Sequence, residues 1–206
     1  MTNRRTEQRI STKLPIEGGA AGCWTVIRHR ACRIVIEKRD AGNLAQDAAH
    51  LAADAPFERR AAGPVEAAVR DLGTLPPPLA VDIHTLALRF AALMNVPAVR
   101  LRLEGITTDA CRKIHADYTD VRLITTCFGP GTDYIQASAD PVEANLVRLS
   151  SGDIALFKGR LFGDDHEPCF HRSPPIVQTE GRRLVLVIDT PLDEAMTPQT
   201  GIPLRK

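Results

Sequence analysis

The sequence has few aromatic residues: Phe, Trp and Tyr make up 4% of its 206 positions, against 44% for hydrophobic residues as a whole. A core built from this composition must therefore be mainly aliphatic. Long apolar runs are also missing, since the longest, such as Leu184–Ile188, are strand-sized and a transmembrane helix needs about 20 residues. The polar segment Met1–Lys13 lacks the apolar stretch of a secretory signal peptide, so we expect a cytoplasmic protein without a membrane span.

Charge and cysteine content exclude further classes. The formal net charge of +1 gives no electrostatic basis for binding nucleic acid or an anionic membrane surface. The five cysteines are odd in number and have no tight framework spacing, which favours reduced thiols over a disulfide scaffold. The sequence also lacks the G-x-x-x-x-G-K-[ST] pattern, so a phosphate-binding loop of that kind is not expected.

The order of the predicted elements divides the chain into a helical part and a strand part. Residues 1–22 are charged and then rich in glycine, so we expect a mobile arm before a single metal-binding domain over residues 23–206. The predicted class is α+β, with a helical N-terminal half that supports a sandwich or small barrel. The patterns predict helices at 44–53, 65–72 and 79–94 and strands at 33–37, 99–103, 121–128, 146–149, 154–158 and 184–189.

Proline and glycine mark two of the connections between these elements. The run Pro76–Pro78 predicts a stiff connector before the helix at 79–94. The segment Gly129–Thr132 predicts a tight turn, in which Gly129 and Gly131 supply a positive φ.

Three side chains of the strand part form a candidate metal site. His115 and Asp117 are two residues apart, so on an extended segment both point to the same face. His171 would arrive from a distant strand as a third ligand. Two imidazoles and one carboxylate on one face of an ion are typical of non-haem Fe(II) oxygenases, although the same ligand set also binds Zn(II).

Residues 111–189 resemble the double-stranded β-helix core of the Fe(II)/2-oxoglutarate-dependent oxygenases. The resemblance rests on the His115-x-Asp117 pair, on His171 placed 54 residues after Asp117, and on a basic residue about ten residues further on. It implies a jelly-roll or cupin-like core, Fe(II) held by His115, Asp117 and His171, and 2-oxoglutarate as co-substrate.

The same resemblance implies an arginine that binds the distal carboxylate of 2-oxoglutarate. A guanidinium forms two parallel hydrogen bonds to a carboxylate, which a lysine does not reproduce. Arg182 and Arg183 are adjacent and would face opposite sides of a strand, so only one can point into the barrel. Spacing from the distal histidine favours Arg182, and the Gly-x-Arg pattern favours Arg183. Arg122 and Arg172 are the next candidates.

A closer resemblance is to a bacterial family described only as a domain of unknown function. It rests on the His-x-Asp pair, the segment Gly129–Thr132, the run His171-Arg-Ser-Pro-Pro and the strand that follows Arg182, and it covers most of residues 95–190. Members of that family are often encoded near zinc-responsive genes and metallochaperone GTPases. This resemblance implies a role in metal homeostasis and a metallochaperone GTPase as a partner.

The cysteines support a different site. Cys111 would share a helix face with His115, and Cys169 a strand face with His171, so these four residues could form a closed tetrahedral zinc site. The sequence therefore leaves two functions open. One is an oxygenase that hydroxylates an unidentified small molecule or protein side chain, and the other is a non-catalytic zinc-binding protein. An arginine beside the metal favours the oxygenase, because only that function needs a cation there.

Overall fold

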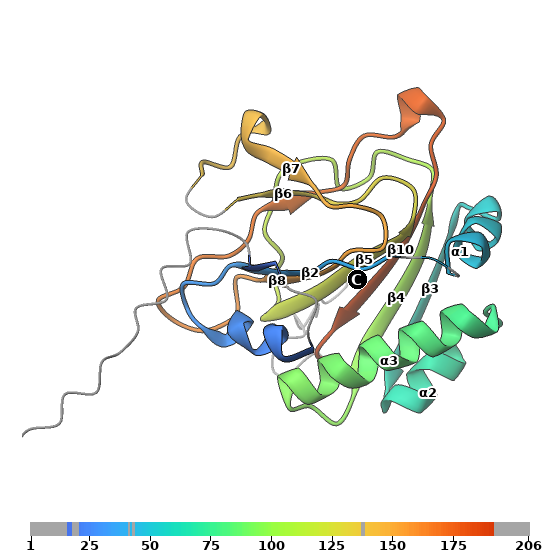
Figure 1. Cartoon of the computed structure of the whole chain (residues 1–206), viewed down its shortest axis with the longest axis horizontal. Coiled ribbons are helices and arrows are strands. Elements are labelled where there is room, and N and C mark those ends of the chain that lie inside the picture. The colour runs from blue at the N-terminus through green and yellow to red at the C-terminus, as the bar shows by residue number, and fades with distance from the viewer. Residues whose placement is uncertain (1–15, 18–20, 41, 43, 137–138, 192–206) are drawn as a thin grey trace, which may run out of the picture.

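The computed structural model describes residues 16–17, 21–40, 42, 44–136 and 139–191, and these residues form ten strands and three α-helices (Figure 1). The helices are α1 (Leu44–Ala53), α2 (Val65–Asp71) and α3 (Pro77–Met94). The strands are β1 (Ile16–Glu17), β2 (Ile34–Glu37), β3 (Phe57–Gly63), β4 (Val99–Ile106), β5 (Val121–Phe128), β6 (Asp133–Ile135), β7 (Leu146–Arg148), β8 (Ile154–Lys158), β9 (His171–Arg172) and β10 (Arg183–Asp189). Short 3₁₀ helices lie at Ala21–Arg28, Glu143–Asn145 and Val177–Thr179.

The strands form two sheets. The large sheet has the order β1-β2-β8-β5-β10-β4-β3, and the small sheet has the order β7-β6-β9. All pairings in both sheets are antiparallel except that of β1 with β2. The described residues thus form a mixed helix and antiparallel-sheet fold.

The two faces of the large sheet have different neighbours. Helices α1, α2 and α3 lie on one side of it, and β6 and β7 lie on the other (Figure 1). Side chains of strand β10 point alternately to the two faces. Leu184, Leu186 and Ile188 belong to the hydrophobic cluster that contains the helices. Val185 and Val187 point the other way, into the cluster beneath the small sheet. Burial of β10 on both faces explains why its sequence is an unbroken apolar run.

The helices follow the predicted pattern with one correction. Helix α1 has the predicted bounds, and α3 ends at Met94 as expected, with Asn95 in the left-handed region (φ 55°). The prediction of a proline connector is wrong, since Pro77 and Pro78 begin α3. The fixed φ of proline suits the first helical turn, where its missing N–H is not needed. Of the helices in the described ranges, none is both long and apolar enough to cross a bilayer.

Strand β2 matches the strand predicted at 33–37, but the N-terminal half is less helical than predicted because it also supplies β1 and β3, the two edges of the large sheet. Ile16–Glu17 belongs to the segment predicted as a mobile arm, yet it pairs with β2. Residues 1–15 and 18–20 of that segment lie outside the described residues. Strand β3 escapes prediction because its charged residues give no apolar run, although its burial alternates along the strand.

Gly129 begins the connection from β5 to β6 with φ at +84°, as predicted, whereas Gly131 does not have a positive φ. A Cβ at Gly131 would instead collide with the backbone of Leu149, so close approach explains this glycine. A Cβ at Gly129 would likewise collide with the carbonyl oxygen of Arg182, the residue just before β10.

We predict that Gly129→Ala destabilises the fold more than Gly73→Ala does. The two glycines share a φ of +84°, but a Cβ at Gly73 would meet nothing within 4 Å. Strain at positive φ costs about 1–2 kcal/mol in either variant, and the collision at Gly129 adds roughly 1–3 kcal/mol, as overpacking does. Denaturant unfolding of both variants measures the difference, and equal losses of stability would show that the backbones do not approach as closely as the structure has them.

Candidate metal centre

His115, Asp117 and His171 lie together although they come from separate segments. An isolated antiparallel bridge joins His115 to His171 at the start of β9, with N···O distances of 2.9 and 2.8 Å in its two backbone hydrogen bonds. Asp117 follows two residues later and is buried. One donor atom from each of the three side chains lies within 4.8 Å of the others. Among the described residues this is the one cluster of at least three His, Cys, Asp or Glu side chains that could hold a metal ion.

The hydrogen bonds of the two imidazoles leave their Nε2 atoms available. Nδ1 of His115 lies 2.9 Å from the carbonyl oxygen of Lys113, and Nδ1 of His171 lies 3.4 Å from that of Cys169. A carbonyl oxygen only accepts, so it favours the proton on Nδ1 and a lone pair on Nε2. Such contacts behind the ring are common for metal-binding histidines.

Both Nε2 atoms face the carboxylate of Asp117. Nε2 of His115 lies 3.7 Å from Oδ1, and Nε2 of His171 lies 3.3 Å from Oδ2. Oδ2 is buried and accepts no hydrogen bond. Burial alone would raise the pKa of Asp117, but His171, Arg122 and His115 hold it below its ordinary value of 3.8, so the carboxylate is ionised at neutral pH. Two imidazole nitrogens and a carboxylate oxygen that converge on one point fit a bound cation.

Arg122 holds the other oxygen of this carboxylate. Its Nη1 donates to Oδ1 of Asp117 at 2.6 Å, while Nε and Nη2 donate to the two oxygens of Asp189 at 2.7 and 2.8 Å. Burial would lower the pKa of Arg122, but its contacts with Asp189 and Asp117 raise it. The guanidinium is therefore fully engaged by two carboxylates, and the prediction that Arg122 offers a cation to a co-substrate finds no support in this geometry.

A pocket of about 470 Å³ opens beside the three residues, and Arg183 lines it. The Arg183 side chain is 1% exposed, yet none of the ion pairs between described residues includes it. Its guanidinium donates to neutral oxygens only: Pro130 O at 2.7 Å, Ser173 Oγ at 3.0 Å, and Thr126 and Thr132 Oγ1 at 3.2 Å each. Burial lowers the pKa of Arg183 to about 10, so it is still charged at pH 7.

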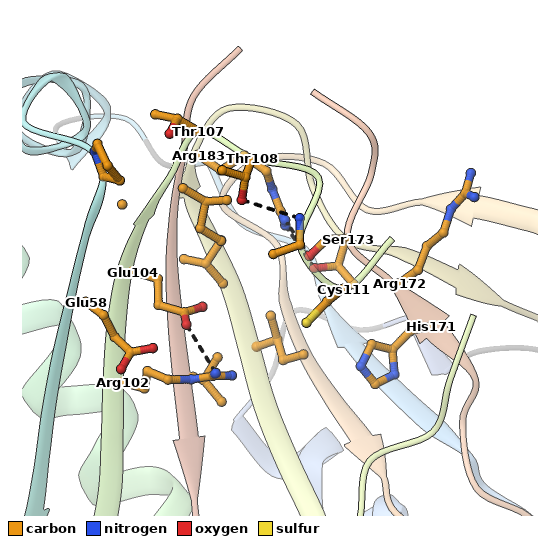
Figure 2. Close-up of a pocket in the computed structure, with 18 of the residues that line it drawn as sticks. Glu58, Arg102, Glu104, Thr107, Thr108, Cys111, His171, Arg172, Ser173 and Arg183 are labelled. Carbon is orange, nitrogen blue, oxygen red and sulfur yellow. Dashed lines mark hydrogen bonds and ion pairs between the residues drawn. The ribbon is translucent and has the colours of Figure 1, made fainter. Parts of the chain in front are cut away.

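The other two predicted arginines are placed differently. Arg182 is exposed, donates to the carbonyl oxygen of Ala53 at 2.5 Å, and does not line the pocket. Arg172 lies at the pocket edge, but Figure 2 shows its side chain directed away from the interior. It donates to Asp133 at 3.2 Å and to Glu143 at 2.8 Å. Of the four candidates, Arg183 is therefore the one that lines the pocket without forming an ion pair with a described residue.

The structure does not assemble the predicted four-residue zinc site. Neither Cys111 nor Cys169 belongs to the cluster of candidate metal ligands among the described residues. Cys111 is exposed at the pocket wall, as Figure 2 shows. The thiol of Cys169 is buried in the apolar cluster beneath the small sheet, and burial raises its pKa well above the ordinary value.

Sequence reasoning missed several residues around the pocket. The hydroxyls of Thr132 and Ser173 accept hydrogen bonds from Arg183, and Asp189 anchors Arg122. The alternation of β10 contained a usable signal, since Arg183, Val185, Val187 and Asp189 are two residues apart and share one face. The pocket wall on β3 and β4 also carries Glu58, Arg102 and Glu104, of which the last two form an ion pair at 3.1 Å (Figure 2).

Comparison with solved structures and with family models shows which known proteins this chain is similar to. The chain is similar to JOX2, whose crystal structure is described as "in complex with 2OG, Fe, and JA", with 9% sequence identity and a TM-score of 0.53. The match covers 84% of this chain and 71% of JOX2. At this identity the likeness shows the fold alone, a mixed helix and antiparallel-sheet fold. The chain belongs to the family described as "Protein of unknown function (DUF1826)", whose model matches residues 25–189.

Two further solved structures are similar with lower scores. The Arabidopsis thaliana dioxygenase for auxin oxidation 1, solved with 2-oxoglutarate, is 10% identical, and the match covers 87% of this chain and 94% of that one (TM-score 0.49). A bsmA homolog from Methylobium petroleophilum is 14% identical over 84% of this chain and 93% of that one (TM-score 0.47). No curated protein matches the sequence.

Proposed function

We propose that this protein binds Fe(II) through His115, Asp117 and His171, binds 2-oxoglutarate beside it, and hydroxylates an unidentified small molecule or protein side chain. The observation that carries the proposal is the charge of Arg183. It lies buried in the same pocket as the three ligands and has only neutral partners among the described residues. A buried charge that forms no direct ion pair is costly, so such a site favours an anionic ligand.

We also propose that the two sheets constitute a double-stranded β-helix. The chain passes repeatedly between the sheets from β5 to β10: β4, β5, β8 and β10 lie in the large sheet, and β6, β7 and β9 in the small one. The bridge from His115 to His171 extends the small sheet beyond β9, at the edge opposite β7. The similarity to JOX2, which was crystallised with 2OG and Fe, supports the same fold and cofactors here.

The residues of the chain have distinct roles in this proposal. Two neutral imidazoles and one carboxylate suit Fe(II) with open positions for a chelating 2-oxo acid. Arg183 would bind the distal carboxylate of that acid, and the hydroxyls of Thr126 and Thr132 orient its guanidinium. Ile124, Val185 and Val187 line the pocket with apolar surface that limits the entry of water. The bound iron and 2-oxo acid would supply the oxygen chemistry that side chains lack.

Anaerobic titration tests this proposal. Fe(II) and 2-oxoglutarate together should produce the metal-to-ligand absorption band of a chelated 2-oxo acid, and neither should produce it alone. Admission of air should then consume 2-oxoglutarate slowly even without the substrate. Absence of the band from protein that retains metal would refute the oxygenase proposal, and retention of Zn(II) alone would support the zinc-binding alternative.

A further inference from the structure

Asp189, Arg122 and Asp117 form a continuous hydrogen-bonded set, which we call the arginine bridge. Arg122 lies on β5 directly opposite Asp189 on β10 in the register of the large sheet. This pairing lets Nε and Nη2 of Arg122 bind both oxygens of Asp189, so that Nη1 projects toward Asp117. A second cation, Arg100 on β4, lies 3.7 Å from Asp189 on its other side.

The bridge divides the two oxygens of Asp117 between two tasks. Oδ1 accepts the hydrogen bond of Arg122 at 2.6 Å and lies 3.7 Å from Nε2 of His115, while the buried Oδ2 has no hydrogen-bond partner among the described residues and lies 3.3 Å from Nε2 of His171. The main chain of Asp117 is fixed as well, because its carbonyl oxygen accepts a hydrogen bond from the backbone N–H of Arg160 at 2.9 Å. The carboxylate therefore cannot rotate freely, and one oxygen is directed at the point where the ligand atoms converge.

We propose that Arg122 and Asp189 are positioning residues, which hold Asp117 so that it binds the metal through a single oxygen. The inference rests on the proposed metal centre and adds two residues to it. Asp189 acts at a distance: it orients Arg122 with two hydrogen bonds, and Arg122 in turn orients the ligand. Changes to groups that orient a metal ligand typically cost about 10–100-fold in metal affinity.

The metal affinity of Arg122→Gln distinguishes a positioning role of Arg122 from a purely electrostatic effect of its charge. Arg122 places a positive charge beside a cation site, so by charge alone its removal in Arg122→Gln should strengthen metal binding. If Arg122 positions the carboxylate, the same change should weaken binding. Asp189→Asn should weaken binding in both cases, because it loosens Arg122 and also removes a negative charge. Arg122→Gln is therefore the decisive variant.

Co(II) titration of the purified protein under argon provides the measurement, since its visible d–d bands report both affinity and ligand geometry. We expect Arg122→Gln and Asp189→Asn each to weaken Co(II) binding by about 10–100-fold and to shift these bands. Glu37→Gln is the matched control. Glu37 also forms a bidentate ion pair, with Arg89 at 3.0 and 2.6 Å, its exposed side-chain fraction of 11% is close to the 9% of Asp189, and it does not line the pocket. This variant should keep wild-type affinity and bands.

The possible outcomes separate the two proposals. If wild-type protein binds Co(II) and Arg122→Gln binds it equally or more tightly, the positioning role is refuted and the metal centre stands. If the wild type binds no Co(II), the metal centre itself falls. Should Arg122→Gln fail to fold, Arg122→Lys carries the test, because it keeps the charge and loses the bidentate geometry. Positioning predicts weaker binding and altered bands in that variant, and charge alone predicts neither.

Discussion

Replacement of Arg183 by leucine is expected to weaken 2-oxoglutarate binding to the Fe(II)-loaded protein by about 2–5 kcal/mol, while Arg182→Leu leaves it nearly unchanged. The difference follows from placement. Arg183 is buried beside the candidate ligands and has only neutral partners, whereas Arg182 is exposed and donates to the backbone of helix α1. A 2-oxo acid that chelates the metal would bring its second carboxylate into this desolvated pocket, where an unpaired charge is costly.

The absorption band of the anaerobic Fe(II) complex measures this difference. Affinity for Fe(II) without 2-oxoglutarate provides the internal control, since a correctly folded Arg183→Leu protein should still bind the metal. Arg183→Lys refines the result: it retains the charge but cannot form two parallel hydrogen bonds, so it should bind 2-oxoglutarate with intermediate affinity. Equal binding by wild type and Arg183→Leu would mean that another group receives the carboxylate.

The remaining candidate cations would be poor substitutes for Arg183. Arg122 already binds two carboxylates, and Arg172 is paired with Asp133 and Glu143. Either arginine could bind a co-substrate only by breaking an existing ion pair, and the free energy lost with that pair would offset much of the free energy gained by binding. The structure thus favours Arg183 over Arg182, a choice that the sequence left open, and keeps Arg122 and Arg172 behind it.

Local signals were sufficient to predict much of the fold. Helix α1 and strands β5 and β8 have the predicted bounds because each carries its own periodic or apolar pattern. Strands β6 and β9 contain only three and two residues, which is too short for any pattern. Strand β3 carries charges that conceal it and is held in place by its pairing with β4.

The proximity of His115, Asp117 and His171 was predictable, but the surroundings of these residues were not. His115 and Asp117 are neighbours in sequence, so their common orientation follows from strand geometry alone. The choice between Arg182 and Arg183 depends on which face of β10 meets the pocket, and that is set by pairing with β4 and β5. The contact of Arg122 with Asp189 spans 67 residues and arises only from that same register.

Alanine at His115, Asp117 or His171 should abolish most metal binding, since two remaining ligands leave a weak and flexible site. The loss should exceed the roughly 10–100-fold effect expected for residues that only orient a ligand. Cys111→Ala and Cys169→Ala are the matched controls, because each cysteine is near a histidine in sequence but lies outside the ligand cluster. Both should retain the metal content of the wild type.

Metal analysis after anaerobic loading and desalting, with thermal unfolding to confirm that each variant is folded, distinguishes the possible ligand sets. Loss of metal from the two cysteine variants, together with retention by Asp117→Ala, would identify a closed zinc site and overturn the facial arrangement. Asp117→Ala should also leave Nη1 of Arg122 without its carboxylate partner, so this variant should lose stability even without metal. His115→Ala removes no such ion pair from Arg122, and its metal-free form should be the more stable of the two.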